Sequence, residues 1–212
     1  LEQAFGCGPH TISVPRLRSA EGVDLARYPH LVSDEDFKKI VAVIRLAVPY
    51  TGMILSTREK PGFRDEVIAL GISQISAGSS TGVGGYADQY GNPDGGDKPQ
   101  FEIGDHRSPM EIIRNLCQSG YLPSYCTACY REGRTGDRFM SLAKSGKIQN
   151  VCQPNALLTF KEFLIDYADG ETKAIGEQTI ARHLEEIPSN TARKRTVERL
   201  QQIEAGARDL YF

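Results

Sequence analysis

Residues 33–76 read SDEDFKKIVAVIRLAVPYTGMILSTREKPGFRDEVIALGISQIS. The stretch opens with Ser33, a residue type that caps helices, and Asp36 is placed to complete a capping box. Apolar residues then recur at helical spacing, namely Phe37, Ile40, Val41, Ile44 and Val48. The pattern predicts a helix that begins after Ser33 and has one apolar face.

Predicted strands lie on both sides of this helix. A strand at His10–Val14 precedes it and a strand at Met53–Ser56 follows it, and then come a short helix at Gly62–Leu70 and a third strand at Ile72–Ser76. Strands and helices that alternate with short connections are typical of parallel βαβ units, so we expect an α/β fold. Three strands do not close a barrel. Residues 1–90 are therefore interpreted as the final strands and helices of a (β/α)8 barrel whose earlier strands lie upstream.

The composition changes after this region. Between Asp88 and Gly104 the chain is rich in Gly, Asp and Pro, and we expect residues 91–104 to form a linker or exposed loop. Residues 105–212 predict a mainly helical domain. Its expected helices lie at 108–120, 136–143, 159–168, 171–186 and 191–204.

Charge and composition narrow the class of protein. The 212 residues contain 25 Lys and Arg against 27 Asp and Glu, which gives a net charge of −2. This balance lacks the excess of positive charge that is typical of proteins that bind nucleic acid or an anionic membrane. The longest apolar run, around Ile40–Val48, is too short to span a bilayer, and the start shows no secretory signal. The chain begins with Leu, which suggests a fragment. We expect a cytoplasmic protein with reduced thiols.

Three of the five cysteines form a spaced set. Cys126 and Cys129 make a C-x2-C pair, and Cys152 follows after 22 intervening residues. Such a set can hold an iron-sulfur cluster with one iron left open, and the intervening glycines and arginines suit a chain that bends around a negative cluster. Structural zinc is an alternative, with His106 or another cysteine as fourth ligand. A redox dithiol with Cys152 merely buried is another.

The two remaining cysteines are expected to pack rather than to bind metal. Cys117 lies within a predicted helix, where a core cysteine is the ordinary case. Cys7 lies between Gly6 and Gly8 and could be near a site, but a packing role is favoured.

Several segments together resemble a known enzyme family. They are GPHTISVPRL, ILSTRE, ISAGSSTGVGGY, GDHRS, CTACYREGRTG with the later Cys152, and RDLYF. In combination they resemble the C-terminal portion of the radical S-adenosylmethionine tyrosine lyase that matures FeFe-hydrogenase. The resemblance covers essentially the whole chain.

The resemblance implies a two-part enzyme. A radical S-adenosylmethionine barrel cleaves tyrosine to p-cresol and dehydroglycine, and an auxiliary 4Fe-4S cluster in the C-terminal domain converts that fragment to iron-bound CO and cyanide for the H-cluster. By resemblance, Cys126, Cys129 and Cys152 are the auxiliary-cluster ligands. The resemblance also implies that His10 holds an additional iron and is therefore both a metal ligand and a catalytic residue. Imidazole is a good ligand for ferrous iron.

The resemblance also implies sites for small molecules. Ser56 and Arg58 would anchor tyrosine, with Arg58 able to grip a carboxylate; a surface salt bridge is the alternative. The loop residues expected to bind cofactor are Gly78, Ser79, Gly82 and Gly84. Tyrosine, S-adenosylmethionine and cysteine are the implied small molecules, and hydrogenase maturation proteins are the implied partners.

One departure from the family pattern concerns the radical motif. The C-x3-C-x2-C motif that binds the second 4Fe-4S cluster is absent from these 212 residues. The chain by itself should therefore generate no radical. A 2-iminoacetate synthase-like tyrosine lyase for thiazole synthesis is the nearest alternative, although Cys152 argues against it, and a non-catalytic zinc-binding module is another.

Overall fold

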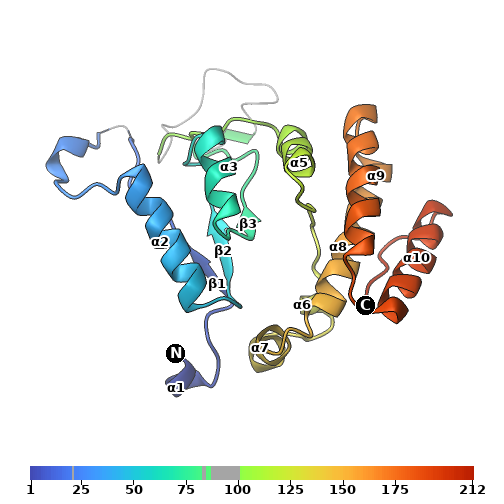
Figure 1. Cartoon of the computed structure of the whole chain (residues 1–212). Coiled ribbons are helices and arrows are strands. Elements are labelled where there is room, and N and C mark those ends of the chain that lie inside the picture. Colours follow the sequence, from blue (N-terminus) through green and yellow to red (C-terminus); the bar gives the residue numbers. More distant parts are fainter. Residues whose placement is uncertain (21, 83–84, 87–100) are drawn as a thin grey trace. The chain divides into compact units, whose positions relative to one another are not determined.

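A computed structural model of the chain describes residues 1–20, 22–82, 85–86 and 101–212. These residues form two compact units. The sheet unit comprises Pro9–Pro109, and the helical unit comprises Leu1–Gly8 together with Met110–Phe212 (Figure 1).

The sheet unit contains three parallel strands in the order β1-β2-β3. Their bounds are Thr11–Ser13 for β1, Gly52–Leu55 for β2 and Gln74–Ile75 for β3. Helix α2 (Asp34–Ala47) connects the first two strands after a short 3-10 turn at Leu25–Arg27, and α3 (Pro61–Ala69) connects the last two. The expected α/β class is confirmed in this parallel βαβ arrangement. A closed barrel stays a prediction.

Local chemistry explains where α2 begins. The Ser33 hydroxyl oxygen accepts a hydrogen bond from the Asp36 backbone N–H at 3.1 Å. The same hydroxyl donates to the Asp36 carboxylate at 2.8 Å. In the predicted capping box this carboxylate accepts from the Ser33 backbone N–H, so a contact between side chains replaces that bond. Phe37 and Val41 are the buried residues of the predicted apolar face.

The helical unit consists of short helices followed by three long ones. Their bounds are Glu2–Phe5 for α1, Pro109–Gln118 for α5, Ala128–Arg131 for α6, Gly136–Lys144 for α7, Gln149–Asp166 for α8, Gly170–Glu185 for α9 and Asn190–Glu204 for α10. Ser189 and Asp169 cap α10 and α9 through their side-chain oxygens. The predicted helices at 136–143, 171–186 and 191–204 are confirmed to within two residues.

The predicted start of α8 is wrong. The helix begins at Gln149, ten residues before the expected start at Thr159, and Pro154 lies inside it. Proline removes one backbone hydrogen bond and is a poor helix former, so the sequence before Thr159 gives a weak helical signal. Apolar packing farther along the same helix outweighs that cost.

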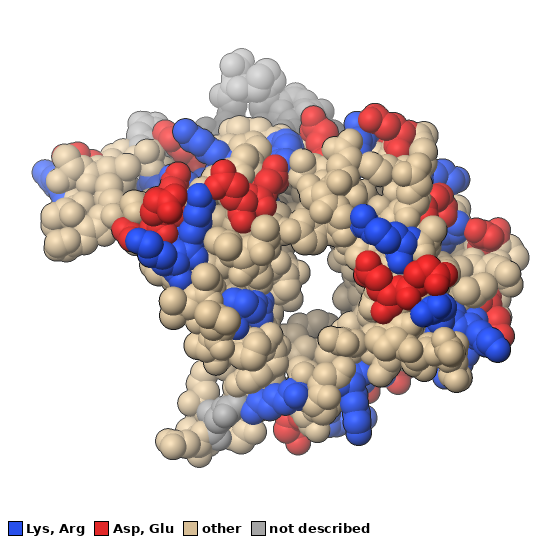
Figure 2. Space-filling view, viewed as in Figure 1, with Lys and Arg blue, Asp and Glu red and all other residues tan. Residues whose placement is uncertain are grey.

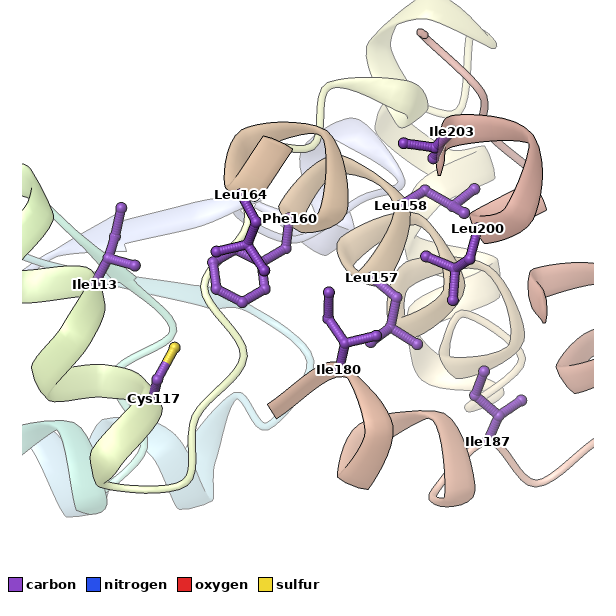
Figure 3. Packing of buried hydrophobic residues seen from close by; sticks show 10 residues of the cluster. All are labelled: Ile113, Cys117, Leu157, Leu158, Phe160, Leu164, Ile180, Ile187, Leu200 and Ile203. Atoms are coloured by element: carbon purple, nitrogen blue, oxygen red, sulfur yellow. The ribbon is translucent and has the colours of Figure 1, made fainter. Parts of the chain in front are cut away.

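The core of the helical unit is shared by four helices and the segment after α9. It contains Ile113 and Cys117 from α5, Leu157, Leu158, Phe160 and Leu164 from α8, Ile180 from α9, Ile187, and Leu200 and Ile203 from α10 (Figure 3). Helices α8 and α9 approach closely at Gly176, where an added Cβ would lie 2.5 Å from Leu164 Cδ2. Glycine is therefore required at this crossing.

Charged side chains of both signs are interspersed on the face shown in Figure 2, in keeping with a net charge near zero. Among the described residues, no helix has the length and apolar character needed to cross a membrane.

Candidate metal centre and substrate loops

Cys129 lies in α6, a single helical turn that sequence periodicity did not predict, and Cys126 lies two residues before that turn. The backbone N–H of Cys126 donates to Ser124 Oγ at 3.1 Å, and its sulfur lies near the Ala128 N–H. Ala128 is buried between the two cysteines. The C-x2-C spacing is thus realised as a short turn fixed by a buried alanine.

Cys152 joins this pair from the first turn of α8. Its thiol interacts electrostatically with the thiols of both Cys129 and Cys126. The structure therefore brings together the three cysteines that the spacing singled out. A helix amino terminus favours negative charge, so the position of Cys152 in an 18-residue helix suits a thiolate ligand.

The local environment affects the acidity of these thiols. Desolvation of the sulfur raises the pKa of Cys152 to about 11, and its two cysteine neighbours contribute to that rise, although the residue as a whole is exposed. Burial also raises the pKa of Cys126. Arg134 acts in the opposite direction on both thiols. A metal held by these thiols as thiolates would therefore have to displace their protons.

Zinc and an iron-sulfur cluster place different demands on the three cysteines. Within the described ranges, no group of three or more His, Cys, Asp or Glu side chains is spaced to hold one metal ion. Structural zinc needs four ligands around one ion, whereas the thiolates of a cubane bind different irons and lie farther apart. His106, the fourth zinc ligand considered, is exposed and belongs to the other compact unit. A buried Arg134 Nε–H without an acceptor among the described residues adds a donor that sulfur could satisfy.

Cys117 has the predicted packing role. It is 4% exposed, belongs to the helical core and lies near Thr179. Cys7 is half-buried in the connection between α1 and β1, and its packing role stays a prediction.

Ser56 and Arg58 follow the carboxyl end of β2, as predicted. Burial alternates along this segment: Thr51, Met53, Leu55, Thr57 and Glu59 are buried, and the residues between them are partly exposed. Ser56 and Arg58 therefore share the less buried side. The Ser56 hydroxyl accepts from the Arg58 backbone N–H at 3.3 Å, and the Arg58 guanidinium lies 3.8 Å from the centroid of the Phe101 ring.

The predicted cofactor loop follows β3 at the same edge of the sheet. Gly78 has a φ of 56° and Ser79 is half-buried. Residues 80–82, which include Gly82, line a cavity of about 500 Å³ together with Phe101, Ile103 and His106. Gly84, also predicted to bind cofactor, lies outside the described residues.

His10 lies at the opposite edge of the sheet. It directly precedes β1, and its carbonyl accepts from the Gly52 N–H at 3.1 Å, at the start of β2. His10 lies at the amino end of β1, where the predicted strand at His10–Val14 also places it, and its role as an iron ligand stays a prediction. Ser56 and Arg58 lie at the carboxyl edge and His10 at the amino edge.

Two buried ion clusters that the sequence did not indicate support the loop after β2. Arg16 grips the Glu59 carboxylate with two hydrogen bonds, at 3.0 and 2.6 Å, and Arg18 binds the same carboxylate. Glu59 continues the period-two burial that the structure shows along β2.

The second cluster joins Arg64 to Asp105, both buried. Arg64 also donates to the Ser76 carbonyl at 2.5 Å, and the backbone N–H of Asp105 donates to the Thr57 carbonyl at 3.0 Å. Burial alone would raise the pKa of Asp105, but hydrogen bonds from Arg107 and Arg64 outweigh it and lower that pKa. These contacts tie the loops after β2 and β3 to one buried carboxylate.

Comparison with known proteins finds one matching family model and several related proteins. Residues 13–122 match the Biotin and Thiamin Synthesis associated domain, which leaves the three clustered cysteines outside the matched range. The 2-iminoacetate synthases of Escherichia coli (strain K12) and Salmonella typhimurium (strain LT2) are 36% and 38% identical over 124 residues, 58% of this chain and 31% of each enzyme.

Two crystal structures resemble the chain more fully. HydG, described as a maturase of the FeFe-hydrogenase, is 68% identical with a TM-score of 0.93 over 100% of this chain and 45% of that one. The FeFe-hydrogenase maturase HydG from Carboxydothermus hydrogenoformans is 39% identical with a TM-score of 0.69, over 94% of this chain and 41% of that one.

The chain spans less than half the length of each of these proteins. The resemblance to an FeFe-hydrogenase maturase that the motifs indicated is confirmed by the whole-chain match. The family match covers more than half of the 212 residues. The chain therefore belongs to the Biotin and Thiamin Synthesis associated domain family.

Proposed function

We propose that the full-length protein is a radical S-adenosylmethionine tyrosine lyase of FeFe-hydrogenase maturation. The observation that carries the proposal is 68% identity to a HydG maturase across the whole of this chain. The clustering of Cys126, Cys129 and Cys152 supports it, because three neighbouring thiols from two segments of the chain are the ligand set that an iron-sulfur cluster needs.

The proposed reaction divides between two parts of the chain. Ser56 and Arg58 hold the amino acid substrate at the carboxyl edge of the sheet, and the loop with Gly78, Ser79 and Gly82 lies beside S-adenosylmethionine. Arg58 carries no carboxylate partner among the described residues, so its guanidinium is available to a substrate carboxylate. This supports the anchor over a surface salt bridge.

The three clustered cysteines hold the auxiliary 4Fe-4S cluster in the proposal. When bound, the cluster supplies an open iron on which the dehydroglycine fragment can be processed to CO and cyanide. The cysteine residues bind and orient the cluster, and Arg134 offsets part of its negative charge. His10 holds the additional iron through an imidazole nitrogen.

The test is an assay of the anaerobically prepared full-length enzyme with tyrosine, S-adenosylmethionine and a reductant. We expect p-cresol and CO in comparable amounts and the brown colour of iron-sulfur clusters. A colourless protein that contains zinc and forms neither product would overturn the proposal in favour of a binding module.

A 2-iminoacetate synthase is the second candidate, favoured by the curated relatives at 36% and 38% identity. It would release p-cresol without CO. The same assay therefore separates the two enzymes, and p-cresol alone would support the second.

Replacement of His10 by Ala in the full-length enzyme is expected to lower the iron content by about one atom per protein, because one imidazole ligand holds one iron. Metal analysis after reconstitution measures this. Replacement of the exposed His30 by Ala is the matched control and should leave the iron content unchanged. An iron content that is equal in the His10 variant and the wild type would refute the role.

A further inference from the structure

We infer that Arg134 is a positioning residue of the auxiliary cluster, donating its Nε–H to a cluster sulfur or thiolate, and that residues Asp209–Phe212, the tail segment, hold it in place. The inference rests on the proposed function, since it requires a cluster on the three cysteines.

The backbone places Arg134 beside the thiols through the end of α6. Gly133 has a φ of 61°, and its N–H donates to the Tyr130 carbonyl at 3.3 Å. The Arg134 N–H donates to the Cys129 carbonyl at 2.8 Å. These two bonds form a Schellman motif, in which the left-handed glycine ends the helix and returns the chain toward it. Arg134 is thus tied to a cysteine through the main chain.

The guanidinium of Arg134 is held at one end only. Its Nη2 donates to the Phe212 carbonyl at 2.6 Å. Its Nε is buried and has no acceptor in the part of the chain that the structure describes. A buried donor left unpaired is costly, and a cluster sulfur is an acceptor that the proposed function supplies at this place. The charge of Arg134 is felt at both Cys126 and Cys152, which places the guanidinium near them.

The tail segment is fixed independently of Arg134. The Phe212 N–H donates to Asn155 Oδ1 at 2.7 Å, and Asn155 Nδ2 donates back to the Phe212 carbonyl at 3.4 Å. Asn155 is 1% exposed and lies one turn after Cys152 on α8. The Arg199 guanidinium lies 4.0 Å from the Phe212 ring centroid and donates to the Tyr211 carbonyl at 2.6 Å.

A second contact ties the tail segment to α6. Arg131, the last residue of that helix, binds the Asp209 carboxylate with both terminal nitrogens and lies 4.8 Å from the Tyr211 ring centroid. The tail segment therefore bridges the helix that carries Cys129 and the helix that carries Cys152. Its carbonyl at Phe212 orients Arg134 between them.

The experiment uses the full-length enzyme with Arg134→Gln, followed by a redox titration monitored by electron paramagnetic resonance. The spectrum of a Cys126→Ala/Cys129→Ala protein is subtracted to isolate the auxiliary cluster. Loss of a hydrogen bond and a positive charge disfavours the reduced, more negative cluster. We expect the equilibrium constant for one-electron reduction to fall about tenfold, a shift of about 59 mV to more negative potential.

Arg138→Gln is the matched control. Arg138 is exposed on α7 in the same part of the chain, and its replacement removes the same charge, so we expect no shift. Arg134→Lys keeps the charge but cannot bind two acceptors in a fixed fork, and should shift the potential by less. If Arg134→Gln does not fold, the reduction potential of Arg134→Lys tests the inference in its place.

Asn155→Ser tests the tail segment. It should shift the potential in the same direction, and the double variant with Arg134→Gln should show no further shift, because both act through one guanidinium. An intact cluster with unchanged potential in Arg134→Gln and Arg134→Lys would overturn the inference, as would full additivity with Asn155→Ser. A wild-type protein without the auxiliary signal would instead overturn the proposed function, and the inference with it.

Discussion

Replacement of Cys126 and Cys129 together by Ala is expected to abolish CO formation by the full-length enzyme while p-cresol release continues. Only one thiol of the set then remains, and one thiolate does not retain a cubane. Iron content should fall by about four atoms per protein, or about five if the additional iron is lost as well. Gas analysis for CO, chromatography for p-cresol and metal analysis measure the three quantities on the same sample.

Cys117→Ala is the control for this variant. It removes a thiol from the helical core without touching the clustered set, so iron content and both products should be retained. Equal loss of CO and p-cresol in the double variant would show that the two steps cannot be separated. That result would contradict the proposed division between substrate loops and cysteines.

Replacement of Asp105 by Ala is expected to destabilise the protein by about 3–5 kcal/mol, because it leaves the buried guanidinium of Arg64 without its carboxylate. The side chains of Arg64 and Asp105 are 1% and 0% exposed. The loops after β2 and β3 should loosen together, and the KM for tyrosine should rise. Calorimetry of the full-length enzyme and steady-state p-cresol kinetics measure these effects.

Asp65→Ala provides the comparison. Asp65 is partly exposed and pairs with Arg107 at 3.3 Å, so its loss should cost about 0–1 kcal/mol. A similar loss of stability in both variants would contradict the expectation that the buried ion pair contributes more to stability than the partly exposed one.

The pKa of Asp105 in the folded protein is lowered. Its contribution is therefore present above the unfolded value of about 3.9 and is lost as the pH falls through the lower folded value.

Local sequence signals were enough to predict most of the sheet unit. The cap at Ser33 and the helical spacing of Phe37 and Val41 predicted α2, because these features act within one element. The start of α8 could not be predicted in the same way. Pro154 weakens the local signal, and the helix is held by contacts of Leu157 and Leu164 with residues far along the chain.

The candidate site shows the same distinction. The spacing of the three cysteines was visible in the sequence. The four-residue α6 was not, because it ends in a Schellman turn at Gly133 and is too short to show an apolar periodicity. The pair of Arg64 and Asp105 joins residues 41 positions apart, and charged side chains give no sequence signal for burial.

The tail segment has a consequence for the biosynthesis of the protein. Arg131 and Arg134 take their partners from residues 78 positions later in the chain, at Asp209 and Phe212. A nascent chain on the ribosome cannot form these bonds until position 212 has emerged from the exit tunnel. Iron and sulfide inserted earlier would meet an incomplete, loosely held set of thiols. We therefore expect the proposed cluster to be assembled only after residues 209–212 have been translated.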